Sequence, residues 1–135
     1  MAAGLCVAVA GVSGCSSGPT GPKSIAVTHY RGIPPGAETA RPLPRTGVNA
    51  AWRDGRLEIT TWGSGSCPGV PTRARARGQH AVEVTISADY SGVCTTDLSP
   101  TTSVIEVPAG IAATGPLTVT MRGDGRGPVV ITVPR

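Results

Sequence analysis

The chain has 135 residues, a formal net charge of +4, 19 glycines, 13 prolines and no phenylalanine. This length fits one domain of ordinary size, and so much glycine and proline argues against long helices. The arginines fit the composition of a GC-rich bacterial genome, so the charge is weak evidence for an anionic lipid, polymer or nucleic-acid partner. In a core without phenylalanine, we expect the aliphatic residues and four aromatic anchors, Trp52, Trp62, Tyr30 and Tyr90.

The N-terminal segment is apolar, and residues 2–14 carry no charged side chain. It is shorter than the roughly 20 residues of a membrane-spanning helix, but it is typical of the apolar region of a secretory signal peptide. It ends in Val12-Ser13-Gly14-Cys15, which has the residue types of a bacterial lipobox. In that motif the thiol is alkylated by diacylglycerol, and small residues let a peptidase cut before the cysteine. We therefore predict that residues 1–14 are a lipoprotein signal peptide and that Cys15 is lipidated.

One feature departs from the lipobox pattern, because no lysine or arginine precedes Lys23. Either the amino terminus supplies the positive charge of the signal peptide, or the true start lies upstream of Met1. The alternative is an apolar first strand with an unpaired Cys15. With the anchor, residues 15–23 are the lipidated cysteine and a flexible tether, and residues 24–135 are a single β-rich domain. That domain would lie on the extracytoplasmic face of the cell membrane.

The rest of the chain alternates short strand-like runs with turn residues, and no window has a sustained helical period. The predicted strands are Ser24–Tyr30, Val48–Arg53, Arg56–Trp62, Gln79–Ala88, Thr101–Val107, the run containing Leu117, Val119 and Met121, and Val129–Val133. Residues 31–47 contain four prolines and are expected to form a loop or an edge segment. Asp54-Gly55 predicts a tight hairpin turn, with Leu57 and Ile59 on one face of the second arm.

About seven short strands predict an all-β fold, an antiparallel β-sandwich. An immunoglobulin-like arrangement is one form of it, and a small β-barrel is the alternative.

Cys67 and Cys94 are the cysteines left in the exported domain besides Cys15, and an even pair there predicts a disulfide. By the chain-entropy relation, closing this loop of about 28 residues stabilises the domain by roughly 3.5 kcal/mol. A metal site or a reactive thiol is the alternative, but no second CxxC accompanies the pair.

No stretch has the pattern of a catalytic or metal site. WGSGSCPGVP at 62–71 lacks the spacing of GxSxG and is expected to form a turn that brings Cys67 to its partner. His29 and His80 have no ligand partners nearby in sequence, whereas a zinc site needs three or four ligands, so we predict no metal and no cofactor. Asp89, Asp97 and Asp124 lie in turns, where carboxylates bind backbone N–H groups; Asp97 is expected to cap a turn beside the disulfide.

Arg73, Arg75 and Arg77 occupy alternate positions in TRARARG. On a strand their guanidinium groups would share one face and could bind anions of lipid headgroups, an envelope polymer or a partner protein. The alternative is a solvated, positively charged edge that discourages strand pairing. No aromatic residue is interleaved with them, which argues against nucleic acid.

WGSGSCPGVP, followed by CTTDLSPTTSVIEVP at 94–108, together with the lipobox, resembles a set of small uncharacterised lipoproteins of actinobacteria. The resemblance covers Trp62–Val107 and the lipobox. It implies export, pairing of Cys67 with Cys94 and a β-rich domain. That family has no assigned activity or catalytic residues, so the resemblance implies none here.

We therefore expect a non-enzymatic, lipid-anchored module that binds an envelope protein or polymer. The alternative from another class is an envelope hydrolase that uses a pair of carboxylates. Its candidate residues are Glu83, Asp89, Asp97, Glu106 and Asp124. A third reading is a structural accessory subunit, which would expose one apolar patch of several hundred Å².

Overall fold

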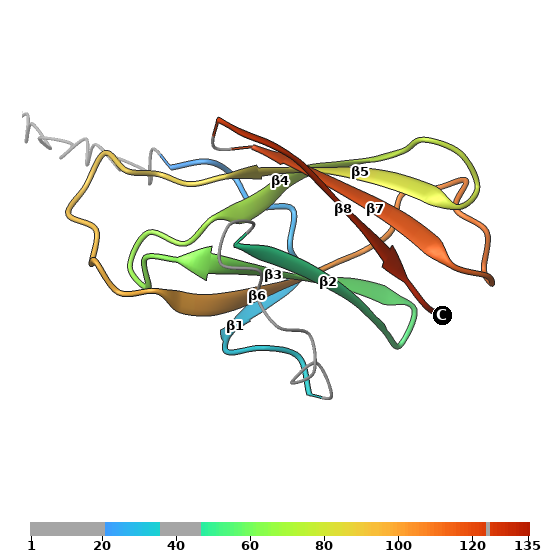
Figure 1. The fold of residues 1–135 in the computed structure, drawn as a ribbon, viewed down its shortest axis with the longest axis horizontal. Helices are drawn as coiled ribbons and strands as arrows, with labels where there is room; N and C mark the ends of the chain where they lie inside the picture. The colour runs from blue at the N-terminus through green and yellow to red at the C-terminus, as the bar shows by residue number, and fades with distance from the viewer. Residues whose placement is uncertain (1–20, 36–46, 124) are drawn as a thin grey trace, which may run out of the picture.

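The computed structural model describes residues 21–35, 47–123 and 125–135 and contains two four-stranded sheets packed face to face (Figure 1). Sheet A has the order β1 (Thr28–Arg31), β6 (Ser99–Ile105), β3 (Arg56–Gly63), β2 (Val48–Arg53). Sheet B has the order β4 (Val70–Ala76), β5 (Ala81–Ser87), β7 (Leu117–Gly123), β8 (Arg126–Val133). Within these ranges, no helix is of a length and apolarity that would let it cross a bilayer.

The predicted β-sandwich is confirmed, and the sheets of the described residues do not close into a barrel. Three details differ from the prediction. There are eight strands, and β5 pairs with β7 in parallel rather than antiparallel. The parallel pair arises because the chain crosses from β5 to β6 in sheet A and back to β7, reversing direction twice. In addition, the strand orders 1-6-3-2 and 4-5-7-8 are not the immunoglobulin orders, which in chain numbering are 1-2-5-4 and 3-6-7.

The β2–β3 hairpin forms as the sequence predicts. Its two turn residues, Asp54 and Gly55, have φ of 50° and 78°, and two positive φ values are the signature of a type I′ turn. This turn matches the twist of the flanking strands and sets the register, in which Trp52 lies opposite Leu57. Leu57 and Ile59 consequently point into the core and are fully buried.

The core between the sheets is aliphatic, and the four aromatic residues do not anchor it as predicted. Its members are Ala50, Leu57, Ile59, Val82, Val84, Ile86, Ile105, Leu117, Val119, Met121 and Val133. Trp52 only packs against the margin of this cluster, where the guanidinium of Arg135 lies 5.1 Å from its ring centroid. Tyr90 is in the loop after β5 and is 63% exposed, since it lies beyond the region where the two sheets face each other.

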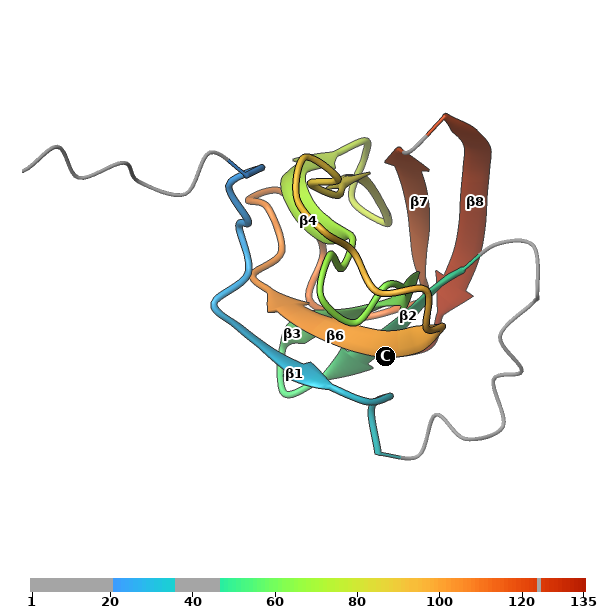
Figure 2. The same ribbon diagram turned by 90° about the vertical axis from the view of Figure 1, so that its left-hand side faces the viewer.

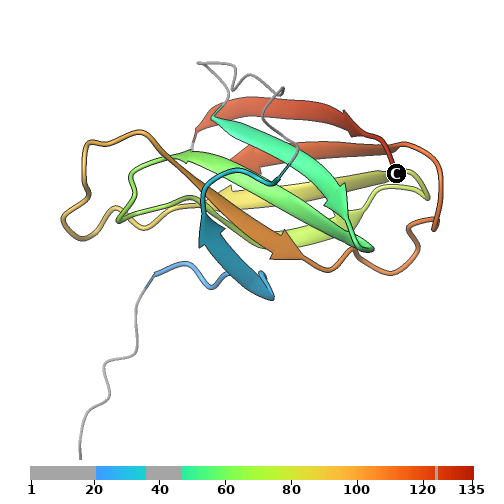
Figure 3. The same cartoon turned by 90° about the horizontal axis from the view of Figure 1, so that it is seen from below.

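The outer face of sheet A is also buried at its centre. Thr60 and Glu58, on the face of β3 opposite Leu57 and Ile59, are 1% and 5% exposed. The Thr60 and Thr102 hydroxyls lie 2.9 Å apart, and Thr102 donates to the carbonyl of Gly32. The chain after β1 therefore folds back over this face, as Figures 2 and 3 show.

The parallel pair β5–β7 depends on a glycine at its end. Gly123 lies opposite Ile86, at a register irregularity between β7 and β8, and has φ of 148°. A Cβ at Gly123 would overlap the carbonyl oxygen of Ile86. A side chain here meets rigid backbone in a conformation that L-residues rarely adopt.

We expect Gly123→Ala to lower the free energy of unfolding by about 2 kcal/mol or more, because it adds both a backbone clash and an unfavourable φ. Gly127→Ala is the matched control: a Cβ there meets nothing within 4 Å, so its effect should stay within about 0.5 kcal/mol. Urea unfolding of both variants measures the difference. Equal midpoints for the two would show that the β5–β7 pairing tolerates a side chain at Gly123.

Candidate functional site

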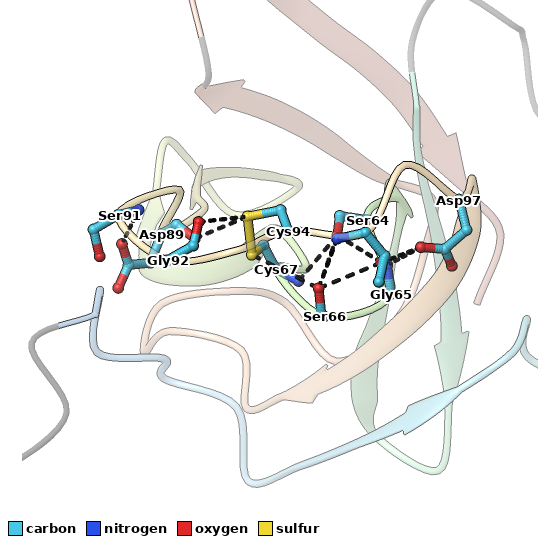
Figure 4. Close-up of a disulfide and its surroundings, with 10 residues drawn as sticks. Ser64, Gly65, Ser66, Cys67, Asp89, Ser91, Gly92, Cys94 and Asp97 are labelled. Carbon is cyan, nitrogen blue, oxygen red and sulfur yellow. Dashed lines mark hydrogen bonds between the residues drawn. A yellow bond between two sulfur atoms is a disulfide. The ribbon is translucent and has the colours of Figure 1, made fainter.

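Two loops cross between the sheets at the same end of the sandwich, and a disulfide joins them. Residues 64–69 lead from β3 to β4, and residues 88–98 lead from β5 to β6. The predicted disulfide between Cys67 and Cys94 is confirmed, with an S–S distance of 2.03 Å (Figure 4). We call this part of the molecule, made of loops 64–69 and 88–98, the disulfide end.

Asp97 connects the two loops of the disulfide end by hydrogen bonds. Its carboxylate accepts from the backbone N–H of Gly65 at 3.0 Å (Figure 4). It also accepts from the hydroxyls of Ser99 and Thr95. These bonds, that of Ser99 foremost, hold the pKa of Asp97 far below its usual range. The predicted role of Asp97, capping a turn beside the disulfide, is confirmed.

A cavity of about 380 Å³ lies between the sheets at this end, within the size range of small-molecule sites. The residues that line it include Trp62, Tyr90 and Met121, and several glycines, such as Gly69, form part of its wall. None of the described residues that line it is an aspartate or glutamate. The cavity therefore offers aromatic surface and hydrogen-bonding backbone, but no carboxylate for acid–base chemistry.

A bulge in β4 decides where the predicted arginine stripe points. Pro71 is buried, and strict alternation would turn Arg73 to the same side. The register shift between Pro71 and Arg73 adds one residue to β4, so Arg73 and Arg75 lie on the exposed outer face, opposite Thr85 and Glu83. Neither forms a salt bridge with a described residue.

Arg77 lies one residue past β4 and is engaged differently from the other two. Its guanidinium is 2.8 Å from one oxygen of Glu83, and Arg122 of β7 is 2.9 Å from the other. These hydrogen bonds, that of Arg77 first, lower the pKa of Glu83. The cluster on sheet B is therefore four arginines around one carboxylate, and Arg122 is a member that the local sequence pattern did not reveal. We call Arg73, Arg75, Arg77 and Arg122 the arginine cluster.

The other carboxylates proposed for a hydrolase bind separate partners. Glu106 pairs with Arg56 at 2.7 Å, and Asp89 accepts from the N–H of Ser91 at 2.9 Å. Asp124 lies outside the described residues. Of the metal candidates, His29 lies on β1 in sheet A and His80 directly before β5 in sheet B. No group of three or more histidine, cysteine, aspartate or glutamate side chains gathers in the described ranges.

Glu58 is a buried charge that its neighbours in the sequence do not reveal. Glu58, on the outer face of β3, accepts from the hydroxyl of Tyr30 at 3.5 Å and lies 3.4 Å from Arg53 Nε. Burial, followed by the nearby charge of Glu58, raises the pKa of Tyr30. Arg53 also donates to the carbonyl of Pro35 at 2.7 Å. The prolines of residues 31–47 are the only local signal, because nothing else in the sequence indicates that Gly32 and Pro35 lie over the outer face of sheet A.

The lipobox and Cys15 lie outside the described residues, so the lipidation site stays a prediction. No family model, curated protein or solved structure matches this chain. The geometry above, with the sequence motifs, is therefore the ground for a functional proposal.

The hydrogen bonds to Asp97 predict a pH-dependent stability. A carboxyl with a depressed folded-state pKa stabilises the fold above its unfolded pKa, and that contribution is lost as the pH falls. Asp97→Ala should therefore be less stable than the wild type at neutral pH, and the difference should shrink between about pH 5 and pH 2. Asp97→Asn is the control, because it keeps one acceptor but cannot titrate. Urea unfolding across this range measures the effect; a gap that stays constant with pH would contradict it.

Proposed function

We propose that this protein is exported, lipidated at Cys15 and retained at the cell membrane, where its domain binds an anionic polymer of the envelope through the arginine cluster. The observation that carries the binding proposal is the exposure of Arg73 and Arg75 on the outer face of sheet B without a salt bridge to a described residue. Arg77 and Arg122 add two further charges, against the single carboxylate of Glu83.

The arrangement of the cluster suits an extended anion better than a small one. Arg73 and Arg122 flank Thr85 on three adjacent strands, which places their backbones about 10 Å apart. Guanidinium groups bind phosphate and carboxylate oxygens in a bidentate manner, so several can contact successive groups of one chain. Neither Arg73 nor Arg75 lines the cavity between the sheets or the one beside Gly21, and both are exposed, which favours a polymer lying across an open face.

Export and anchoring rest on the lipobox, and the Cys67–Cys94 disulfide supports them, since such bonds persist in oxidising compartments. The hydrolase alternative has no comparable support in the described residues. A glycosidase needs two carboxyl groups within about 5–10 Å of each other across a shared cleft, whereas Glu83, Asp97 and Glu106 bind different partners.

Replacing Arg73 and Arg75 together with glutamine should weaken binding to a phosphate-bearing polyanion by about fivefold, because exposed ion pairs contribute about 0.2–1 kcal/mol each. Retention on immobilised polyphosphate, measured over a salt gradient, gives the comparison. Arg56→Gln is the control: it removes the same charge from an exposed side chain of sheet A. If Arg56→Gln weakens retention as much per charge, binding depends on net charge and the proposed surface is wrong.

Intact mass tests the anchor directly. We expect the wild type from a bacterial host with lipoprotein processing to begin at Cys15, to carry acyl mass there and to sediment with membranes. Cys15→Ser should lose the acyl mass, because only a thiol forms the thioether, and should retain residues 1–14, since cleavage follows lipidation. An unmodified wild-type chain that is soluble and keeps residues 1–14 would overturn the anchor.

A further inference from the structure

Loop 88–98 exposes three large apolar side chains at the disulfide end. Tyr90, Val93 and Leu98 are 63%, 97% and 74% exposed. The loop that carries them is held in place by the disulfide through Cys94 and by the hydrogen bonds of Asp97 (Figure 4). Large apolar side chains that are held exposed together on one loop are typical of a contact surface. We call Tyr90, Val93 and Leu98 the apolar tip.

The described chain begins beside this same loop. A Cβ at Gly21 would lie 3.0 Å from the carboxylate of Asp89, and Gly21 and Pro22 share a cavity wall with Ser91 and Gly92. In Figure 1 the start of the blue segment and the loop between β5 and β6 lie at one end of the sandwich, and the C-terminus lies at the other.

Chain length then limits how far the apolar tip can be from a lipid anchor. Five residues separate Cys15 from Gly21, and an extended chain spans at most about 3.3–3.6 Å per residue. An acylated Cys15 thus keeps Gly21 within about 20 Å of the lipid surface. We propose that the apolar tip inserts into the headgroup boundary of the membrane to which Cys15 is anchored; this rests on the anchoring part of the proposed function.

The charges near the tip fit contact through apolar surface. Asp89 and Asp97 bind groups of the protein itself, and two cations offset them. Arg31 donates to the carbonyl of Gly65, next to Asp97, and Lys23 is exposed two residues after Gly21. Tyrosine favours the membrane interface because its ring is apolar and its hydroxyl polar. Insertion should therefore persist on neutral phosphatidylcholine and at raised ionic strength, where binding by surface charge weakens.

Fluorescence quenching by bilayer lipids tests this in the full chain. Val93→Trp and Val130→Trp are a matched pair, because both valines are exposed but Val130 lies on β8, away from the tip. Each purified protein is reconstituted into phosphatidylcholine vesicles that carry brominated acyl chains. Trp52 and Trp62 give the same background in both. We expect about threefold more quenching of the added tryptophan in Val93→Trp than in Val130→Trp, because an inserted tip lies about 5–10 Å into the interface.

The possible outcomes separate the tip from the anchor, since intact mass is measured on the same preparations. Equal quenching in the two variants, with Cys15 acylated, would overturn the membrane-contacting tip and leave the anchor standing. Selective quenching of Val93→Trp in a chain without acyl mass would support the tip and overturn the anchor. A change in Val93→Trp emission that occurs in native membranes but not in protein-free vesicles would assign the tip to a protein partner, and the lipid inference would be wrong.

Discussion

The covalent bond between Cys67 and Cys94 is the constraint on which one end of this fold depends. It links the two crossings between the sheets that lie at this end, β3 to β4 and β5 to β6, so it fixes the sheets relative to each other beyond the edge of the aliphatic core. By the chain-entropy relation such a bridge stabilises by roughly 3.5 kcal/mol, a large share of the 5–15 kcal/mol typical of a domain. The core has no phenylalanine, and its larger aromatic residues lie at the margin, so this contribution offsets a modest apolar burial. The same bond orders loop 88–98 and forms part of the cavity wall through Cys67.

The outer faces of the two sheets have opposite chemistry. On sheet A, the segment after β1 covers the centre of the face and buries the Glu58 carboxylate with Tyr30 and Arg53 beside it. On sheet B, the outer residues of β5 and β7 remain accessible, and the charge there is concentrated in the arginine cluster. A buried carboxylate is destabilising unless its charge is paired. The charged and polar groups on the covered face of sheet A are therefore engaged in contacts within the fold. The open face has cations without partners in the described residues, and this asymmetry makes sheet B the side on which an anion can bind.

The sequence pattern correctly predicted those features of the fold that depend on residues close together in the chain. The Asp54-Gly55 turn and the alternation of β5 each depend on a few neighbouring residues, and the structure has both. Asp97 also caps a turn beside the disulfide, but its backbone partner, Gly65, lies 32 residues away in the other loop. The parallel pairing of β5 with β7 could not be predicted, because it depends on which sheet β6 joins. The direction of Arg73 depends on a bulge of one residue, which alternation alone misses. The burial of Glu58 depends on a distant segment folding over it, and no property of β3 reveals that.

The apolar tip and the arginine cluster fit together in one orientation of the molecule. The strands run from the disulfide end to the opposite end, where the C-terminus lies (Figure 1). With the tip inserted at the lipid headgroups, the strands would run away from the membrane, and the two sheets would lie roughly perpendicular to the plane of the bilayer. Arg73 lies near the start of β4, at the disulfide end, and Arg77 lies just past its far end. Four residues of extended chain span about 13 Å, so the cluster would present cations at increasing distance from the lipid. A face arranged in this way would meet the proposed polymer where it extends outward from the membrane, and a lipid anchor on Cys15 would keep the face there through the short chain to Gly21.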